Sequence, residues 1–384
     1  MHVVLVTTSY PESSSGSEAA GGFVADFAHQ LAQHSKVTVI AATSGPASRL
    51  SEGSLQVHRF SVPRWPLSLL KPYRPSDWWP ILRTLRDGKR TVDEVIRSER
   101  PDYIFALWAL PSGHWARVML DRYGIPYGVW ALGSDIWSLG RIPILRWYLR
   151  NVLKRADRCF ADGLELAAQV TEIGGASCDF MPSARLLPKT CARDLATSGP
   201  WRLAFLGRWH VNKGIDIFLK SLRALTSDDW EQIAEVRIHG GGPLENEVRS
   251  LVTELRECGH PVSVGGYLDK ERATELICWT DYLTLPSRIE SIPVILSDAA
   301  QLGRPLIATP VGDLPRLFAN HQFGIIAEAA TVAAYTLALQ RALRTSPAQF
   351  RSGLSALADE FDIRRVADGF ARYVEDIGCN ESAS

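Results

Sequence analysis

Short apolar runs alternate with amphipathic stretches along the whole chain. The runs predict buried strands, and the stretch after the first run predicts a helix because Phe23, Phe27 and Leu31 recur at a spacing of four. In the first half, the predicted strands are 3–6, 37–41, 103–107 and 127–132, and the predicted helices are 23–33, 113–122 and 145–157. Strands that alternate with helices are typical of a parallel sheet covered by helices on both faces.

A second series of the same kind follows residues 177–200, which contain three prolines and no hydrophobic period and are predicted to be a linker. Its predicted strands are 203–205, 236–239, 262–264, 282–285 and 305–308, and its predicted helices are 215–224, 293–302, 332–344 and 364–377. The pattern predicts an α/β protein of two Rossmann-like doubly wound domains that face a central cleft. We assign 1–190 to the first domain, 200–362 to the second, and 363–384 to a helix and tail that packs back toward the first.

Composition supports a globular protein and argues against nucleic-acid binding. Of the 384 residues, 46% are hydrophobic and 22% are charged. The 42 basic and 42 acidic residues balance, whereas a protein that neutralises nucleic-acid phosphates needs a basic surplus. The balance hides an asymmetry, because residues 1–200 have a net charge of +5 and residues 201–384 a net charge of −5.

The cysteines and the N-terminus predict a cytoplasmic protein. The six cysteines are scattered and no two have the CxxC spacing, which favours reduced thiols over a disulfide framework or a zinc site. The N-terminus has no basic segment followed by a long apolar region, so we expect no signal peptide. No apolar run reaches the ~18 residues that a membrane-spanning helix requires.

The first candidate motif is a pair of cations where a predicted strand meets a predicted helix. The strand ends at Gly207, and Arg208 and Lys213 follow it, close to the start of the helix. A helix N-terminus carries partial positive charge and free N–H groups, and an arginine can bind phosphate through two hydrogen bonds. The motif therefore predicts a receptor for a diphosphate. The alternative is a loop with two solvated cations.

The second candidate motif places two carboxylates around the start of a later helix. Glu290 lies in the loop before Pro293, and Asp298 lies between one and two turns into the helix. One carboxylate could bind sugar hydroxyls and the other ribose hydroxyls, while the N–H groups of Ser291 and Ile292 could bind phosphate. The alternative is an acidic loop followed by an ordinary solvated aspartate.

The third candidate motif is glycine-rich. Gly240, Gly241 and Gly242 precede Pro243 and allow a ligand to approach the backbone closely. The motif is not a dinucleotide fingerprint, because Glu245 stands where that pattern requires Gly or Ala. The chain also lacks GxxxxGK[ST], which disfavours a P-loop ATPase.

The order and spacing of these motifs resemble the retaining, GT-B-fold glycosyltransferases of the family-4 (group 1) type. The resemblance covers nearly the whole chain and is strongest from 207 to 324. The segments with family counterparts are Tyr10-Pro11 with Gly21-Gly22, Trp108–Gly113, Gly133–Ile136, Gly207-Arg208 with Lys213-Gly214, Gly240–Pro243, Val264–Leu268, Glu290 to Asp298, and Ala308–Pro315.

The resemblance implies a role for each matched residue. Arg208 and Lys213 would hold the donor diphosphate, Glu290 would contact the transferred sugar, and Asp298 would bind the ribose. With Glu290, the two cations form the expected catalytic set. The expected donor-binding set is Gly21, Gly22, Gly207, Gly240, Gly242, Tyr267, Leu268, Ser291, Ile292 and Asp298, and the expected acceptor-side residues are Trp108 and Asp135. Because two cations and a helix terminus can stabilise the leaving charge, the resemblance implies no metal and no cofactor.

Three positions depart from the family pattern. The second acid of the E-x7-E motif is Asp298, which is one methylene shorter than glutamate. Leu132 stands where the family often has a histidine that contacts the donor sugar, and residues 181–184 replace a P-N-G turn. Of the histidines near motifs, His114 and His210, each is expected to be structural rather than a substitute.

The resemblance implies transfer of a sugar from a UDP- or GDP-sugar to a glycan or polyprenyl-linked acceptor, with retention of anomeric configuration, in cell-surface polysaccharide biosynthesis. The leaving phosphate would take the acceptor proton, so no side-chain base is required. Two alternatives remain. The first is a non-catalytic nucleotide-sugar-binding protein, and the second is a GT-B-fold UDP-sugar 2-epimerase, which the cations and the acidic pair disfavour.

Basic and aromatic residues gather in the first half of the chain. Residues 59–100 hold ten Lys/Arg with Trp65, Trp78 and Trp79 between them, and 141–158 hold six basic residues and one acid. Such an amphipathic segment can lie on an anionic membrane, so we hypothesise peripheral contact with its inner face. The alternative is that the apolar stripe of 145–156 faces the core, while the basic face of the helix is exposed to solvent.

Overall fold

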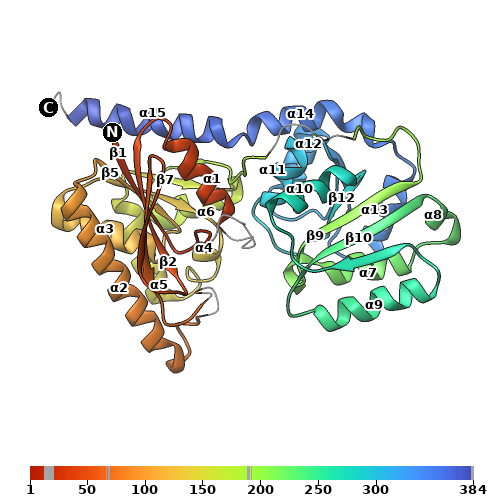
Figure 1. The fold of residues 1–384 in the computed structure, drawn as a ribbon, viewed down its shortest axis with the longest axis horizontal. Helices are drawn as coiled ribbons and strands as arrows, with labels where there is room; N and C mark the ends of the chain where they lie inside the picture. Colours follow the sequence, from red (N-terminus) through yellow and green to blue (C-terminus); the bar gives the residue numbers. More distant parts are fainter. Residues whose placement is uncertain (13–20, 66, 68–69, 188–190, 192, 382–384) are drawn as a thin grey trace. The chain divides into compact units, whose positions relative to one another are not determined.

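The structure is a computed structural model of residues 1–384 and describes all of them except 13–20, 66, 68–69, 188–190, 192 and 382–384. The chain divides into two compact units (Figure 1). The first contains the residues up to Pro182 together with those from Ile363 onward, and the second contains Ser183–Asp362. Residues 183–187, assigned above to the first domain, therefore belong to the second unit. The side chain of Gln301 donates to the Arg185 carbonyl (2.8 Å) and thus ties this segment to the second unit.

The first unit is built on an eight-stranded sheet with the order β3-β4-β2-β1-β5-β6-β7-β8. All its neighbouring strands are parallel except β3 and β4, which form a hairpin at one edge. The strands are β1 (His2–Thr7), β2 (Lys36–Thr43), β3 (Ser48–Glu52), β4 (Leu55–Ser61), β5 (Tyr103–Leu107), β6 (Tyr127–Ala131), β7 (Arg158–Ala161) and β8 (Cys178–Phe180). The helices are α1 (Gly22–Leu31), α2 (Pro75–Glu99), α3 (Ser112–Tyr123), α4 (Ser134–Trp137), α5 (Pro143–Arg155), α6 (Leu164–Gly174) and α15 (Ile363–Glu381).

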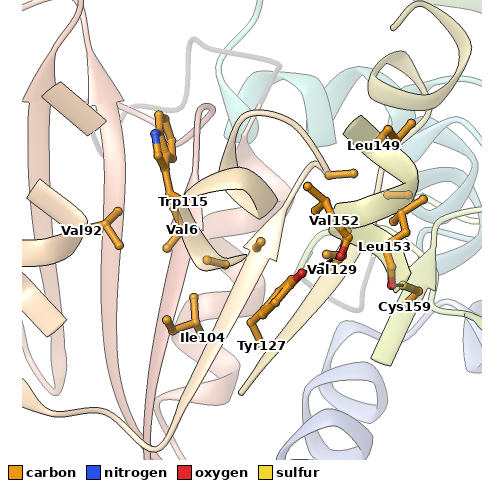
Figure 2. Packing of buried hydrophobic residues seen from close by; sticks show 14 of the residues in the cluster. Val6, Val92, Ile104, Trp115, Tyr127, Val129, Leu149, Val152, Leu153 and Cys159 are labelled. Carbon is orange, nitrogen blue, oxygen red and sulfur yellow. Dashed lines mark hydrogen bonds between the residues drawn. The ribbon is translucent and has the colours of Figure 1, made fainter. Parts of the chain in front are cut away.

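One face of this sheet is covered by α2, α3 and α5. Figure 2 shows Val6 and Ile104 from the sheet, with Val92 and Trp115 from the helices, inside this cluster of buried side chains. Strands that are buried on both faces read as continuous apolar runs, which is why 3–6 and 103–107 are recognisable in the sequence.

The terminal helix α15 covers the opposite face of the same sheet, beside α1 (Figure 1). Its Phe370 is buried, with its ring centroid 4.2 Å from that of Phe105 and 5.7 Å from that of Phe27. The Tyr373 hydroxyl also donates a hydrogen bond to Asp157. Hydrophobic burial of this kind ties the end of the chain to the first unit.

The second unit is a six-stranded parallel sheet with the order β11-β10-β9-β12-β13-β14. Its strands are β9 (Trp201–Arg208), β10 (Ile233–Gly241), β11 (Val262–Gly265), β12 (Tyr282–Leu285), β13 (Leu306–Ala308) and β14 (Gly324–Ile326). Its helices are η2 (Val211–Lys213), α7 (Ile215–Arg223), α8 (Ser227–Glu231), α9 (Glu245–Glu257), α10 (Lys270–Trp279), α11 (Val294–Gln301), α12 (Leu314–His321), α13 (Val332–Leu343), η3 (Pro347–Phe350) and α14 (Arg351–Glu360). The predicted architecture of two Rossmann-like units is confirmed.

The prediction that the cysteines are reduced is wrong for one pair. Cys191 and Cys278 form a disulfide, with an S–S distance of 2.04 Å and a sequence separation of 87. Cys191 lies in the segment before β9, and Cys278 lies in the last turn of α10. No spacing rule connects two such distant residues, because only the fold brings them together. Among the described cysteines, Cys159, Cys178 and Cys258 are free.

Candidate functional site

The sequence motifs of the second unit all follow the carboxyl ends of its parallel strands. Such strands end at the same edge of the sheet, where open α/β folds bind their ligands. The motifs and the strands that they follow are Arg208–Lys213 after β9, Gly242–Pro243 after β10, Tyr267–Leu268 after β11, Glu290–Ile292 after β12 and Gly312–Asp313 after β13. The structure thus brings the predicted residues of this unit to one edge.

Lys213 and Glu290 form an ion pair between the loops after β9 and β12. The Lys213 ammonium donates a hydrogen bond to Oε1 of Glu290, and the Ser287 hydroxyl donates to the same oxygen (2.9 Å). The Glu290 side chain is 11% exposed and the Lys213 side chain 36%. The pair thus places a cation beside an oriented carboxylate, and these groups can bind a phosphate and sugar hydroxyls respectively.

Arg288 connects the loop after β12 to the residues that follow β9. Its Nη1 and Nη2 donate to the two carboxylate oxygens of Asp216 (2.7 and 2.6 Å), and Nη1 also donates to the Val211 carbonyl (2.7 Å). Burial alone would raise the pKa of Asp216, but the Arg288 guanidinium holds that pKa below its usual range. Arg288 therefore supports the geometry of the Lys213–Glu290 pair. The sequence analysis did not single out Arg288.

Glycine is required where the loops touch. Gly214 adopts φ +65°, and a Cβ there would lie 1.8 Å from the Pro286 carbonyl oxygen. A Cβ on Gly240 (φ +151°) would lie 1.9 Å from the Gly207 carbonyl oxygen. A Cβ on Gly242 (φ +148°) would lie 2.7 Å from the Trp209 carbonyl oxygen. The predicted glycines therefore let neighbouring loops meet closely at this edge.

Arg208 and Tyr267 lie on the exposed side of the edge. Arg208 is exposed at the end of β9, where a guanidinium can reach an incoming anion. Tyr267 is exposed as well, and its hydroxyl donates to the Gly241 carbonyl (2.6 Å). Leu268 beside it is half-buried. The Tyr267 hydroxyl thus links the loop after β11 to the end of β10.

The turn at Ser291 and Ile292 is buried and has spare hydrogen-bonding capacity. The Ser291 hydroxyl is buried without a hydrogen-bond partner in the described structure. The N–H groups of Ser291 and Ile292 donate no hydrogen bond to another described residue. Buried donors of this kind are costly unless a ligand or water satisfies them. The turn can therefore receive an anionic oxygen.

Asp298 is fully buried and paired with a residue that the sequence analysis missed. Arg185 donates from Nε to Oδ1 of Asp298 (3.1 Å) and from Nη2 to Oδ2. The Asp298 side chain is 0% exposed, so a ribose hydroxyl could reach it only if Arg185 moved. Arg185 follows the first unit and belongs to no recognised motif, so no local pattern marked it. The ribose contact of Asp298 stays a prediction.

The predicted residues of the first unit lie at the carboxyl edge of its own sheet. Gly21 precedes α1 with φ +117°, and Gly22 begins that helix; residues 13–20, between Tyr10-Pro11 and these glycines, lie outside the described residues. Trp108 follows β5 with φ +69°, a conformation that tryptophan rarely adopts. Asp135 follows β6, and its Oδ2 accepts a hydrogen bond from the Ala109 N–H (2.6 Å).

Asp135 is a buried carboxyl with a perturbed pKa. Burial raises the pKa of Asp135 to about 6, and hydrogen bonds from backbone N–H groups, Ala109 first, partly oppose the rise. Leu132 also donates its backbone N–H to Asp135 (3.4 Å), so the residue that replaces the family's histidine contacts Asp135 through its main chain. Asp135 thus fixes the loop that carries Trp108.

The two histidines near motifs have structural contacts. The His114 ring bonds the Tyr148 hydroxyl, and burial, together with Arg117 and Lys89, lowers the pKa of His114 to about 4. His210 accepts a hydrogen bond from the Asn212 N–H (3.1 Å) and so caps η2. No three His, Cys, Asp or Glu side chains are arranged for a metal ion within the part of the chain that the structure describes.

Two family models match the chain, one in each unit. The model described as "Glycosyl transferase 4-like domain" matches residues 19–181, and the model described as "Glycosyl transferases group 1" matches residues 200–345. The chain belongs to the group 1 glycosyltransferases. The matched ranges include the motifs of both sheet edges, so the family assignment and the site geometry concern the same residues.

Relatives are about a quarter identical to this chain over the residues that align. A glycosyltransferase of Bacillus subtilis (strain 168) named for teichuronic acid biosynthesis, TuaC, is 25% identical over 265 residues. That alignment covers 64% of this chain and 64% of the relative, slightly less than two thirds of its length. A D-inositol 3-phosphate glycosyltransferase of Corynebacterium glutamicum (strain R) is 27% identical over 185 residues, which are 47% of this chain and 44% of the relative.

Solved structures confirm that the fold of this glycosyltransferase is GT-B. Sucrose-phosphate synthase from Thermosynechococcus elongatus superposes with a TM-score of 0.75, 16% identity and 99% coverage of both chains. Anabaena Alr3699/HepE, solved with UDP and glucose, superposes with a TM-score of 0.70 and 12% identity over 98% of this chain and 100% of that one. None of the helices in the described ranges has the length and hydropathy to cross a membrane.

Proposed function

We propose that this glycosyltransferase moves a sugar from a UDP- or GDP-sugar to a glycan or lipid-linked saccharide, with retention of anomeric configuration, in cell-surface polysaccharide biosynthesis. The observation that carries the proposal is the Lys213–Glu290 pair at the carboxyl edge of the second sheet, next to the exposed Arg208. Neighbours of the same fold, solved with UDP and glucose or with UDP-2-fluoro glucose, support the donor class.

In the proposed reaction, Arg208 and Lys213 bind the donor diphosphate, and Glu290 accepts hydrogen bonds from the sugar. The bond between the anomeric carbon and the phosphate oxygen breaks, and the acceptor oxygen bonds to the anomeric carbon on the face that the nucleotide leaves. The acceptor proton passes to the leaving phosphate oxygen. The two cations and the N–H groups of Ser291 and Ile292 stabilise the charge that develops there, so we propose that the reaction needs no metal.

The teichuronic acid relative and the inositol phosphate relative support acceptors of the polyhydroxylated class. We infer that the edge of the first sheet, with Trp108 and Asp135, lies on the acceptor side. An aromatic ring there offers a sugar face to stack on, and a rigid loop keeps the acceptor oriented.

Turnover on a panel of UDP- and GDP-sugars tests the proposal. The panel is incubated with saccharide and polyprenyl-phosphate saccharide acceptors, released nucleotide is measured, and product anomers are read by NMR. We expect nucleotide release with one donor class and an anomeric configuration equal to that of the donor. A protein that binds UDP or GDP but releases nucleotide from no pair would instead be a binding protein, and an inverted product would refute retention.

A further inference from the structure

Two adjacent tryptophans near the start of α2 are exposed to solvent. Trp78 is 56% exposed and Trp79 61%, and Leu82, one turn later, is 65% exposed. Tyr73, just before the helix, is exposed as well. Single exposed apolar side chains are ordinary on a protein surface, but four large ones between residues 73 and 82 form a cluster that requires an explanation.

The packing of α2 does not use this cluster. The helix buries the face that carries Asp77, Pro80, Thr84 and Gly88, and Gly88 lies so close to the Trp115 ring that a Cβ would approach it to 2.3 Å. Trp115 also donates its indole N–H to the Leu85 carbonyl (3.0 Å). Figure 1 shows α2 as a long helix that extends past the strands of its own unit. The exposed side chains therefore lie on the side of α2 that the core does not bury.

Basic side chains surround the cluster. Between residues 71 and 90 the basic residues are Lys71, Arg74, Arg83, Arg86, Lys89 and Arg90, against the acids Asp77 and Asp87, a net charge of +4. Asp77 is buried and bound by Arg64 (2.6 Å), which leaves Asp87 as the acid that Arg83 and Arg86 contact (3.4 and 2.9 Å). Arg83 also lies over the Trp79 ring at 5.4 Å, and the two side chains line a shallow hollow with Leu82 and Arg86.

We propose that this surface, made of Tyr73, Trp78, Trp79, Leu82 and the six basic residues around them and called here the α2 surface, docks on an anionic lipid bilayer. Tryptophan and tyrosine favour the level of the lipid headgroups, because their rings are apolar and carry a polar N–H or O–H group. Arginine binds headgroup phosphates through paired hydrogen bonds. A second copy of the chain fits less well, because two surfaces of net positive charge repel each other.

The α2 surface lies in the first of the two basic stretches that the sequence offered for membrane contact, 59–100, and the second, 141–158, contains α5. The apolar stripe of α5 includes Leu149 and Val152, which are buried in the core (Figure 2), as the alternative interpretation held. The exposed apolar residues of α5 are Ile144 and Trp147. Trp147 is therefore a matched control for the α2 tryptophans, since it is an exposed tryptophan of the same unit on a different helix.

Vesicle co-sedimentation with the full chain tests the proposal. Vesicles of phosphatidylcholine mixed with phosphatidylglycerol are compared with pure phosphatidylcholine at low and high salt, for the wild type, Trp78→Ser/Trp79→Ser, Trp78→Phe/Trp79→Phe and Trp147→Ser. We expect the wild type to bind the anionic vesicles at low salt and to be released by high salt. The serine pair should weaken binding about tenfold, whereas the phenylalanine pair and Trp147→Ser should stay near the wild type.

Three results would overturn the proposal. In the first, the wild type stays in the supernatant with anionic vesicles at low salt. In the second, the Trp78→Ser/Trp79→Ser variant sediments with the vesicles like the wild type. In the third, sedimentation velocity shows a wild-type dimer that this variant does not form. Because all changed residues are exposed, circular dichroism should show folded variants. Binding is measured without donor and turnover without vesicles, so failure of this proposal and failure of the proposed reaction are distinguishable.

Discussion

The Lys213 ammonium donates a hydrogen bond to the Glu290 carboxylate across 77 residues of sequence. The contact depends on Gly214, because the loop after β9 can approach the loop after β12 only where no Cβ intervenes. The ion pair therefore forms only when the two loops meet. A substitution at Gly214 can disturb the geometry of the pair while both charged residues are kept.

Gly214→Ala should disturb that geometry. Its Cβ would overlap the Pro286 carbonyl, and φ +65° is unfavourable for alanine, so the loops must separate. We expect nucleotide release to fall at least about tenfold, with a lower melting temperature. The matched control is Gly369→Ala on α15, because the space around Gly369 is open within 4 Å. Equal turnover in the two variants would mean that the close approach has no catalytic role.

Arg185→Ala should destabilise the second unit by leaving the Asp298 carboxylate buried and unpaired. Removing one partner of a buried ion pair lowers the free energy of unfolding by about 3–5 kcal/mol. Removing an exposed arginine side chain such as that of Arg256 lowers it little. Urea denaturation of Arg185→Ala and Arg256→Ala measures the difference. The double variant Arg185→Met/Asp298→Leu should recover most of the loss, and an Arg185→Ala protein as stable as the wild type would show that the pair is not formed in solution.

The disulfide between Cys191 and Cys278 should stabilise the second unit by closing a long loop. Chain entropy gives an upper value of about 4.6 kcal/mol for a loop of 87 residues, and 2–4 kcal/mol is the usual measured range. We expect a reductant and Cys191→Ser each to lower the melting temperature, with no further effect when they are combined; Cys258→Ser serves as the control. Six reactive thiols in the denatured, unreduced protein, rather than four, would refute the bond.

Asp135 should make stability depend on pH in the acidic range. Its pKa of about 6 lies above the ordinary value of 3.8, so the folded protein binds this proton more tightly than the unfolded chain. The stabilisation of the folded state by protonated Asp135 is complete below pH 3.8 and is lost as the pH rises through 6. Each unit by which the pKa is raised corresponds to about 1.4 kcal/mol of this stabilisation. The free energy of unfolding of the wild type, relative to Asp135→Asn, should therefore fall between pH 4 and 6. A constant difference across this range would contradict the assignment.

Much of the fold was predictable because its strands are buried and its helices are amphipathic. The runs at 3–6 and 282–285 are strands in the structure, and the glycine and cation motifs lie at strand ends as predicted. The hairpin of β3 and β4 was not predicted, because β3 is a polar edge strand. The helix α2 was missed because Pro80 and two exposed tryptophans interrupt its helical pattern.

The site was only partly predictable for a related reason. Arg208, Lys213 and Glu290 stand in local motifs, whereas Arg185 meets Asp298 through a contact between residues 113 apart. The sequence marked Asp298 as an accessible acid, but its burial depends on Arg185, which no spacing rule connects to it. The disulfide was missed on the same ground. Contacts between distant segments that share no motif cannot be predicted from the sequence, because only the folded structure brings those segments together.

The central claim is that the exposed cation at the end of β9 binds the donor diphosphate. The most direct test is nucleotide release by Arg208→Ala beside Arg256→Ala, an exposed arginine of the same unit on α9. Loss of a preorganised group that stabilises the leaving charge lowers kcat by about 100- to 1,000-fold. We predict a loss of this size for Arg208→Ala and turnover within about twofold of the wild type for Arg256→Ala. Wild-type turnover in Arg208→Ala would contradict the placement of the diphosphate at this edge.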